Sequence, residues 1–306
     1  MNNPHKDTTL PDFLTIPYIT ESNRYLELRQ DYLDAVLSDL KIITADAHLV
    51  IQSIKWRDII FAPRDMFDSF EVESWEIPAQ APLMPLIVLF AGIEQMRQFY
   101  EEHHIPDKVF KDTIADINRN IGESKLRNGK YLIEPFVFNW LVKHMTNRVF
   151  HLGRLQFEAK RIEEDHVPIK TGDYVLNTHI PAGGKLPYND ILDAYRQAAD
   201  LFQQLTPDIK YKGFICESWM LSPQLKEILD AESNLIKFLS DYEIYRKDDD
   251  ESFYTYVYIN KPNNLLDLPE DTTLQSAIKH HLLAGGKIES GCGFIPMSKI
   301  WKGGSG

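Results

Sequence analysis

The chain has 306 residues, of which 43% are hydrophobic and 25% are charged, as expected for a globular protein of one or two domains. Its formal net charge of −12 argues against nucleic acid or an anionic membrane as a partner, because both need a basic surface, and mildly favours a cationic or amine substrate. With only two cysteines, Cys216 and Cys292, we expect no disulfide framework and a cytoplasmic location. The first ten residues do not resemble a signal peptide, and the longest apolar run, 83–93, is too short to cross a bilayer.

The first half of the chain has the periodicity of helices. Apolar residues recur at steps of three and four from 25 to 40, and further helices are predicted over 45–53, from Pro85 to about 103, over 106–120 and from Pro135 to 145. Near residue 150 the period changes from about 3.6 to 2, which is typical of strands. We therefore predict a mainly helical N-terminal domain over 1–149, a second domain over 150–302 and a flexible tail over 303–306.

The second half of the chain alternates strands with helices. Helices are predicted from Asn189 as N-cap, from Ser222 as N-cap with a proline after it, and from Thr272, where Gln275 completes a capping box. The second of these helices is expected to break at Ser233. Strands are predicted over 150–162, with Gly153 as a bulge, and over 175–180, 213–219, 253–259 and 288–295.

The stretch 175–204 is the most informative part of the sequence. A short strand ends at Pro181, the turn 182–185 (Ala-Gly-Gly-Lys) follows, and an amphipathic helix begins after it. Such a turn presents unpaired backbone N–H groups and the positive end of a helix dipole, a combination that binds phosphate, and Lys185 would add a point charge. The alternative is that the turn only reverses the chain, because two aspartates early in the helix already complement the dipole.

Four motifs, HLGRLQFE (151–158), HIPAGGKL (179–186), CESWMLSP (216–223) and SNLIKF (233–238), resemble a bacterial group of acyltransferase-domain proteins. That group joins a helical N-acyltransferase N-terminal domain to a GNAT-like C-terminal domain. The resemblance covers nearly the whole chain and implies an α+β fold, with a helical N-terminal domain followed by a mixed β-sheet flanked by helices.

The order of elements over 150–300 is also similar to the acyl-CoA-binding half of GNAT-type N-acyltransferases. In that superfamily the turn after the fourth strand holds the CoA pyrophosphate, and the fourth and fifth strands splay apart to admit the pantetheine arm. The usual GNAT turn pattern, Arg or Gln followed by x-x-Gly-x-Gly or Ala, is absent here.

The resemblance implies acetyl-CoA or a longer acyl-CoA as cosubstrate, held by the turn and by the two strands on either side of it. No metal is expected, because the pairs His103-His104 and His280-His281 are adjacent in helices, where successive side chains point about 100° apart. The candidate cofactor-binding residues are Ile180, Ala182, Gly183, Gly184, Lys185, Leu186, Cys216 and Ser218.

Acyl transfer to an amine needs a base for the ammonium proton and backbone donors for the developing oxyanion, and often an acid for the leaving thiolate. The candidate bases are His179, at a strand end beside the turn, and Glu217, in an apolar strand where burial would make a carboxylate more basic. Tyr242, with Tyr245 close by in sequence, is the candidate acid. Each residue has a structural alternative: a histidine that only stabilises the strand end, an outward-facing carboxylate, or a phenol that packs in the core.

Cys216 is not expected to be a nucleophile, because buried cysteine usually behaves as a small hydrophobe and no Cys-His spacing supports covalent catalysis. Arg154 and Glu158 either line the acceptor side of the site or pair with each other.

The leading prediction is an N-acyltransferase that moves an acyl group from acyl-CoA to a small-molecule amine by direct attack in a ternary complex. The helical domain would shape the acceptor or acyl pocket. The alternative is a catalytically silent acyl-CoA-binding or regulatory protein, which would bind CoA without releasing a thiol. A protein-interaction scaffold, the third possibility, would bind no CoA.

Overall fold

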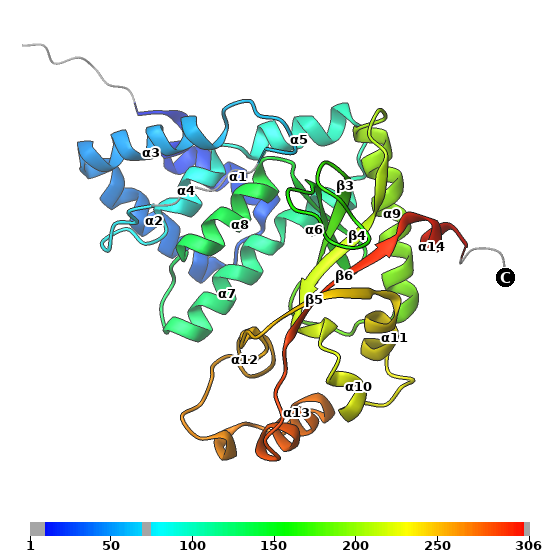
Figure 1. Cartoon of the computed structure of the whole chain (residues 1–306). Coiled ribbons are helices and arrows are strands. Elements are labelled where there is room, and N and C mark those ends of the chain that lie inside the picture. Colours follow the sequence, from blue (N-terminus) through cyan, green and yellow to red (C-terminus); the bar gives the residue numbers. More distant parts are fainter. Residues whose placement is uncertain (1–9, 69–74, 303–306) are drawn as a thin grey trace, which may run out of the picture. The chain divides into compact units, whose positions relative to one another are not determined.

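The protein is described here by a computed structural model over residues 10–68 and 75–302. The tail predicted over 303–306 lies outside the described residues. The chain divides by its internal contacts into two compact units, residues 1–149 and 150–306 (Figure 1).

Helices dominate the described part of the N-terminal unit. All seven residues of α4 are buried, which confirms that the apolar run at 83–93 contributes a core helix. Within the described ranges, no helix combines the length and the apolar character needed to span a membrane. The elements are η1 (Asp12–Leu14), α1 (Ile16–Leu26), α2 (Gln30–Ala45), α3 (Ala47–Ile60), α4 (Met84–Phe90), α5 (Ile93–Glu102), α6 (Asp107–Ile114), α7 (Asp116–Asn128) and α8 (Pro135–Met145).

Several predicted helices of this unit have different bounds in the structure. The stretch 25–40 covers the end of α1 and much of α2, because Glu27 has a φ of 48° and ends α1 in the left-handed conformation. The runs 85–103 and 106–120 each contain two helices, and α3 continues past the predicted end at 53. Pro85 and Pro135 do lie in the first turn of α4 and α8, as predicted.

A mixed six-stranded sheet forms the centre of the C-terminal unit (Figure 1). Its strand order is β1-β2-β3-β4-β6-β5, in which β3 and β4 are parallel while β2–β3, β4–β6 and β5–β6 are antiparallel. This mixed sheet confirms the predicted α+β fold class. The strands are β1 (Val149–Leu152), β2 (Leu155–Arg161), β3 (Tyr174–His179), β4 (Tyr211–Ser218), β5 (Glu243–Asp248) and β6 (Ser290–Pro296).

The helix α9 (Tyr188–Leu205) packs along one face of this sheet. Its fully buried Tyr195 contacts the rings of Phe157 in β2 and Phe214 in β4, with centroids 5.6 and 4.7 Å away. Burial of each such aromatic side chain stabilises the fold by roughly 1.5–3 kcal/mol. The opposite face carries a separate apolar cluster that includes Ile215. The remaining helices are η2 (Trp219–Leu221), α10 (Leu225–Ile228), α11 (Asn234–Asp241), α12 (Ser252–Tyr258), η3 (Leu265–Asp267), α13 (Thr273–Leu283) and α14 (Met297–Lys302).

The predicted strand at 253–259 is wrong. The segment forms the helix α12, in which Phe253, Tyr254 and Tyr258 are buried and the Tyr258 hydroxyl donates to the carbonyl of Gln275 at 2.6 Å. Tertiary packing therefore overrides the strand preference of tyrosine, valine and threonine. The sheet is completed instead by β5, a polar strand at its edge.

Three local predictions are also corrected. Gly153 is not a bulge but has a φ of 62° in the two-residue connection between β1 and β2. Asn189 does not cap α9, which begins one residue earlier with Pro187 in the capping position and no side-chain cap. Ser222 follows η2 and does not cap α10.

The other helix starts agree with the sequence. The hydroxyl of Ser233 accepts from the backbone N–H of Ile236 and begins α11, so the break predicted at this serine is confirmed. Both hydrogen bonds of the capping box formed by Thr272 and Gln275 are present at the start of α13. Each cap of this kind contributes about 1 kcal/mol.

Candidate active site

The parallel strands β3 and β4 are paired along only part of their length. Their register runs from Tyr174 opposite Tyr211 to Asn177 opposite Ile215, and there the pairing ends. Both strands continue, β3 to His179 and β4 to Ser218. Beyond the last pair, one row of β4 backbone groups therefore has no partner on the β3 side.

The glycine turn lies directly after β3. Gly183 and Gly184 have φ values of 81° and 73°, and an added Cβ would meet no heavy atom within 4 Å at either position. Within the described part of the chain, the backbone N–H groups of 182–186 donate to no protein acceptor. The first turn of α9 follows, so unpaired donors and the positive end of a helix dipole lie together, as the sequence predicts.

The face of the sheet away from α9 carries His179. Its Nε2 lies 3.2 Å from Nδ2 of Asn177 and 3.7 Å from a carboxylate oxygen of Glu158, and its side chain is 29% exposed. The register explains the grouping, because Glu158 is directly opposite Asn177, and His179 is two residues further along on the same face. The ring nitrogen Nε2 of His179 is therefore held between the amide of Asn177 and the carboxylate of Glu158.

Glu217 shares this face but is not buried, so the expectation of a burial-activated base is wrong. Its side chain is 62% exposed, and its carboxylate lies 3.1 Å from Nη2 of Arg246 in β5. The same guanidinium contacts Asp248 at 2.9 Å. The physical reason is position, because Glu217 is an outward-pointing residue near the end of β4, where the sheet face opens to solvent.

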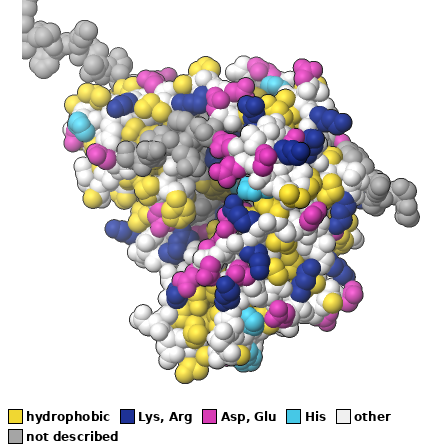
Figure 2. All heavy atoms as spheres, viewed as in Figure 1, with side chains coloured by type: hydrophobic (Ala, Val, Ile, Leu, Met, Phe, Trp, Pro, Cys, Tyr) yellow, Lys and Arg dark blue, Asp and Glu magenta, His cyan; other side chains and the backbone are white. Residues whose placement is uncertain are grey.

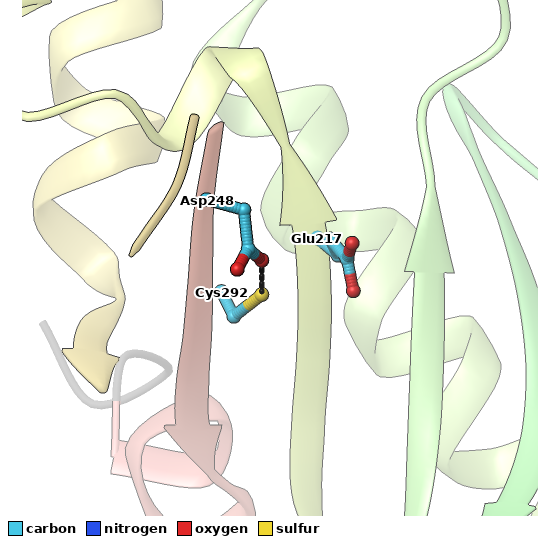
Figure 3. A group of neighbouring side chains, drawn as sticks. All are labelled: Glu217, Asp248 and Cys292. Carbon is cyan, nitrogen blue, oxygen red and sulfur yellow. Dashed lines mark hydrogen bonds between the residues drawn. The ribbon is translucent and has the colours of Figure 1, made fainter. Parts of the chain in front are cut away.

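Figure 3 shows Glu217 with two further potential metal donors, Asp248 of β5 and Cys292 of β6. The donor atoms of the three residues lie within 4.8 Å of one another. Burial, with the charge of Glu217, raises the pKa of the Cys292 thiol to about 12, and this thiol donates a 3.5 Å hydrogen bond to Asp248. A protonated thiol is a poor metal ligand, and both carboxylates are already paired with Arg246, so these donors do not suit a metal ion.

The opposite face, beneath α9, carries a buried polar group. The hydroxyls of Tyr242 and Tyr195 lie 2.5 Å apart, next to the buried Cys216 and Thr178. Burial raises the pKa of both phenols well above the usual value and also raises the pKa of the Cys216 thiol. All three groups therefore keep their protons at neutral pH, which makes Tyr242 a potential proton donor and Cys216 a poor nucleophile.

The structure separates some of the residues that the sequence grouped. Tyr245 packs against the apolar cluster and stacks on His166 with ring centroids 5.1 Å apart, away from Tyr242. Ser218 uses its hydroxyl to accept from the backbone of Met220 at 3.1 Å. The guanidinium of Arg154 donates to the carbonyls of the glycine turn.

Two members of this arrangement, Tyr195 and Asn177, are not predicted from the sequence. Tyr195 belongs to the buried face of the amphipathic helix that follows the glycine turn. The signal for its role is that a fully buried phenol requires a hydrogen-bond partner, and Tyr242 is that partner. Asn177 lies two residues before His179 in a strand, which puts both side chains on one face, and that spacing is the signal that identifies it.

Family models match both units of the chain. The N-acyltransferase N-terminal domain matches residues 18–147, and the GNAT-like C-terminal domain matches residues 149–295. The chain belongs to the acyltransferase proteins that join these two domains. These matches confirm the family resemblance of the four motifs.

Solved acyltransferases share the fold of this N-acyltransferase. It is 21% identical to an acyltransferase in complex with decanoyl-CoA, covering 96% of this chain and 91% of that one, with a TM-score of 0.76. It is 22% identical to an acyltransferase in complex with decanoyl-CoA and teicoplanin, again covering 96% and 91%, with a TM-score of 0.77. A complex with CoA and 10C-teicoplanin gives 22% identity, coverage of 91% and 87%, and a TM-score of 0.75. No curated protein matches the chain.

Proposed function

We propose that this protein transfers an acyl group from acyl-CoA to a small-molecule amine by direct attack in a ternary complex. The observation that carries the proposal is the end of β3–β4 pairing at Asn177 and Ile215, directly before a glycine turn with unbonded N–H groups. In a GNAT-like N-acyltransferase these two features supply an opening for a thioester arm and a cradle for phosphate.

The cosubstrate would bind along these two features. The N–H groups of 182–186 and the first turn of α9 would hold the pyrophosphate, with Lys185 as an exposed point charge. The pantetheine arm would lie between β3 and β4, beside Cys216 and Ser218, where β4 has backbone groups free on the β3 side. The N–H groups there would also serve the oxyanion.

His179 and Tyr242 lie on opposite faces of the sheet, and each would carry one of the two proton transfers of the reaction. The amine nitrogen attacks the thioester carbonyl, a C–N bond forms, and His179 takes the proton that the nitrogen loses. The tetrahedral intermediate then collapses, the C–S bond breaks, and the thiolate of CoA takes a proton from Tyr242, which recovers one from solvent. We assign His179 as the base ahead of Glu217, because the carboxylate of Glu217 is bound to Arg246 and faces solvent.

The acceptor is proposed to be an amine of small-molecule size. In support, two solved acyltransferases of this fold are complexes with teicoplanin and decanoyl-CoA and with 10C-teicoplanin and CoA. On the face shown in Figure 2, basic side chains lie among acidic ones, and the net charge is −12. This balance favours a cationic ligand over nucleic acid. The two buried free thiols suit a reducing compartment, so we propose a cytoplasmic enzyme.

The N-terminal unit is proposed to shape the acyl or acceptor pocket. It contains a cavity of about 230 Å³ lined by apolar side chains, among them Phe61, Met66 and Met145, together with polar ones such as Gln95. Met66→Trp would narrow this cavity. A shift of preference toward shorter acyl-CoA esters would assign the cavity to the acyl chain, and a raised KM for the amine alone would assign it to the acceptor.

The test of the proposed function is thiol release from acyl-CoA esters of two to ten carbons, measured against a panel of amines. Release that depends on the amine, with the acylated amine seen by mass spectrometry, is the expected result. Binding of acyl-CoA by calorimetry without thiol release for any amine would instead support the silent acyl-CoA-binding alternative.

A further inference from the structure

Arg154, in the connection between β1 and β2, is bound to the glycine turn. Its guanidinium donates to three carbonyl oxygens: Nη1 to Pro181 at 3.1 Å, Nη2 to Gly183 at 2.6 Å and Nε to Lys185 at 2.8 Å. The three acceptors are alternate residues, so one planar side chain spans the whole turn. A planar, rigid fork of donors is the property of arginine that allows this, and lysine lacks it.

The turn needs such an external anchor. Gly183 and Gly184 both have positive φ, and glycine in a turn loses more conformational freedom on ordering than any other residue. The turn also has little packing of its own, since no heavy atom lies within 4 Å of an ideal Cβ at either glycine. Hydrogen bonds to a charged donor are stronger than neutral ones, so Arg154 is the main contact that fixes the backbone path.

The same contacts favour an anion at the turn. Carbonyl oxygens repel phosphate, and those of Pro181, Gly183 and Lys185 are neutralised by the guanidinium. The N–H groups of 182–186 have no acceptor in the described protein and stay available as donors. The Arg154 side chain thus occupies the carbonyl acceptors of the turn and leaves the N–H donors of the turn available to an anion.

We propose that Arg154 is a positioning residue, which holds the glycine turn in the conformation that binds the pyrophosphate of acyl-CoA. This inference rests on the proposed function for the identity of the anion, but the ordering of the turn by Arg154 does not. Arg154 touches neither the thioester nor the amine in this assignment. A substitution of Arg154 should therefore affect only the binding of the phosphate-bearing part of acyl-CoA.

The first experiment tests the ordering without any ligand. Trypsin cleaves after Lys185, whose carbonyl accepts from Arg154, and the fragment ending at this residue is measured by mass spectrometry. Arg154→Met should be cleaved there about tenfold faster than wild type, and Arg154→Lys should be intermediate. Lys212→Met, which removes an exposed positive charge elsewhere in the same unit, is the control and should match wild type. Equal cleavage of Arg154→Met and wild type would overturn the proposal.

The second experiment tests the link to the pyrophosphate. KM and kcat are measured with an acyl-CoA and with the matching acyl-pantetheine, which has the same thioester but lacks the nucleotide. Arg154→Met should raise the KM for acyl-CoA about tenfold or more, with kcat and the activity on acyl-pantetheine within twofold of wild type. An equal loss with both donors would show a general structural role and overturn the assignment. Failure of the wild type to bind acyl-CoA would refute the proposed function, while the trypsin result would still report on the turn.

Discussion

Gly184→Val tests whether the glycine turn binds the cosubstrate. The φ of Gly184 is 73°, and an added Cβ would meet no protein atom within 4 Å, so the substitution has a backbone cost but no steric clash within the protein. Placing a non-glycine residue in the left-handed region costs roughly 1–2 kcal/mol, with a β-branched residue at the upper end. If the turn relaxes to negative φ in the free variant, binding must restore it, and each 1.4 kcal/mol lowers affinity about tenfold.

We therefore expect the Kd for acyl-CoA to rise about 5- to 30-fold from the backbone term, and further if the new side chain meets the phosphate. Gly129→Val is a matched control. Gly129 has a φ of 70° and open space around its Cβ, but it ends α7 in the N-terminal unit. Both variants should lose similar thermal stability, and only Gly184→Val should lose affinity in isothermal titration. Unchanged affinity in Gly184→Val would remove the turn from the site, and equal loss in both variants would show that the effect is not local.

Three further predictions concern catalysis and pH. His179→Ala should lower kcat by about 10² to 10⁴ with little change in the Kd for acyl-CoA, whereas Glu217→Gln should keep most activity; the reverse ranking would move the base to Glu217. Cys216→Ala should retain activity apart from a packing loss, because burial keeps this thiol protonated, and a trapped acyl-enzyme on Cys216 would refute direct attack. Hydrogen bonds from Lys287 and Gln224 lower the pKa of Glu289 from 4.5 to about 2. The stability that ionised Glu289 gives to the folded protein is therefore fully present above pH 4.5 and is lost as pH falls toward 2. The Tm difference between wild type and Glu289→Gln should shrink over that range, and a constant difference would contradict this prediction.

The two errors in the sheet have one physical origin. The segment 253–259 has the residue types of a strand, yet its aromatic side chains bury better as the helix α12. The actual edge strand β5 has the sequence EIYRKD, with polar residues exposed along it. Edge strands commonly carry charged side chains, which protect the sheet against pairing with other chains. Such a strand lacks the alternating apolar residues from which strands are predicted, so β5 is not predicted from the sequence.

Local signals predicted more of the fold than of the site. Ser233 and the pair Thr272–Gln275 act through contacts within four residues, so their caps could be predicted from the sequence. The environment of Glu217 could not, because its exposure and its partner Arg246 depend on the order of β4, β6 and β5 in the sheet. Likewise, nothing near Arg154 in the sequence indicates that it reaches a turn about 30 residues away.

The parting of β3 and β4 also bears on how fast a ligand can enter. Each strand end is held from outside: His179 of β3 remains opposite Gln156 of β2, and Ser218 of β4 remains opposite Gly291 of β6. The gap is therefore fixed by pairing that a thioester arm does not have to break. Association should then follow a single exponential phase whose rate rises linearly with acyl-CoA concentration, without the plateau that a slow opening step would impose.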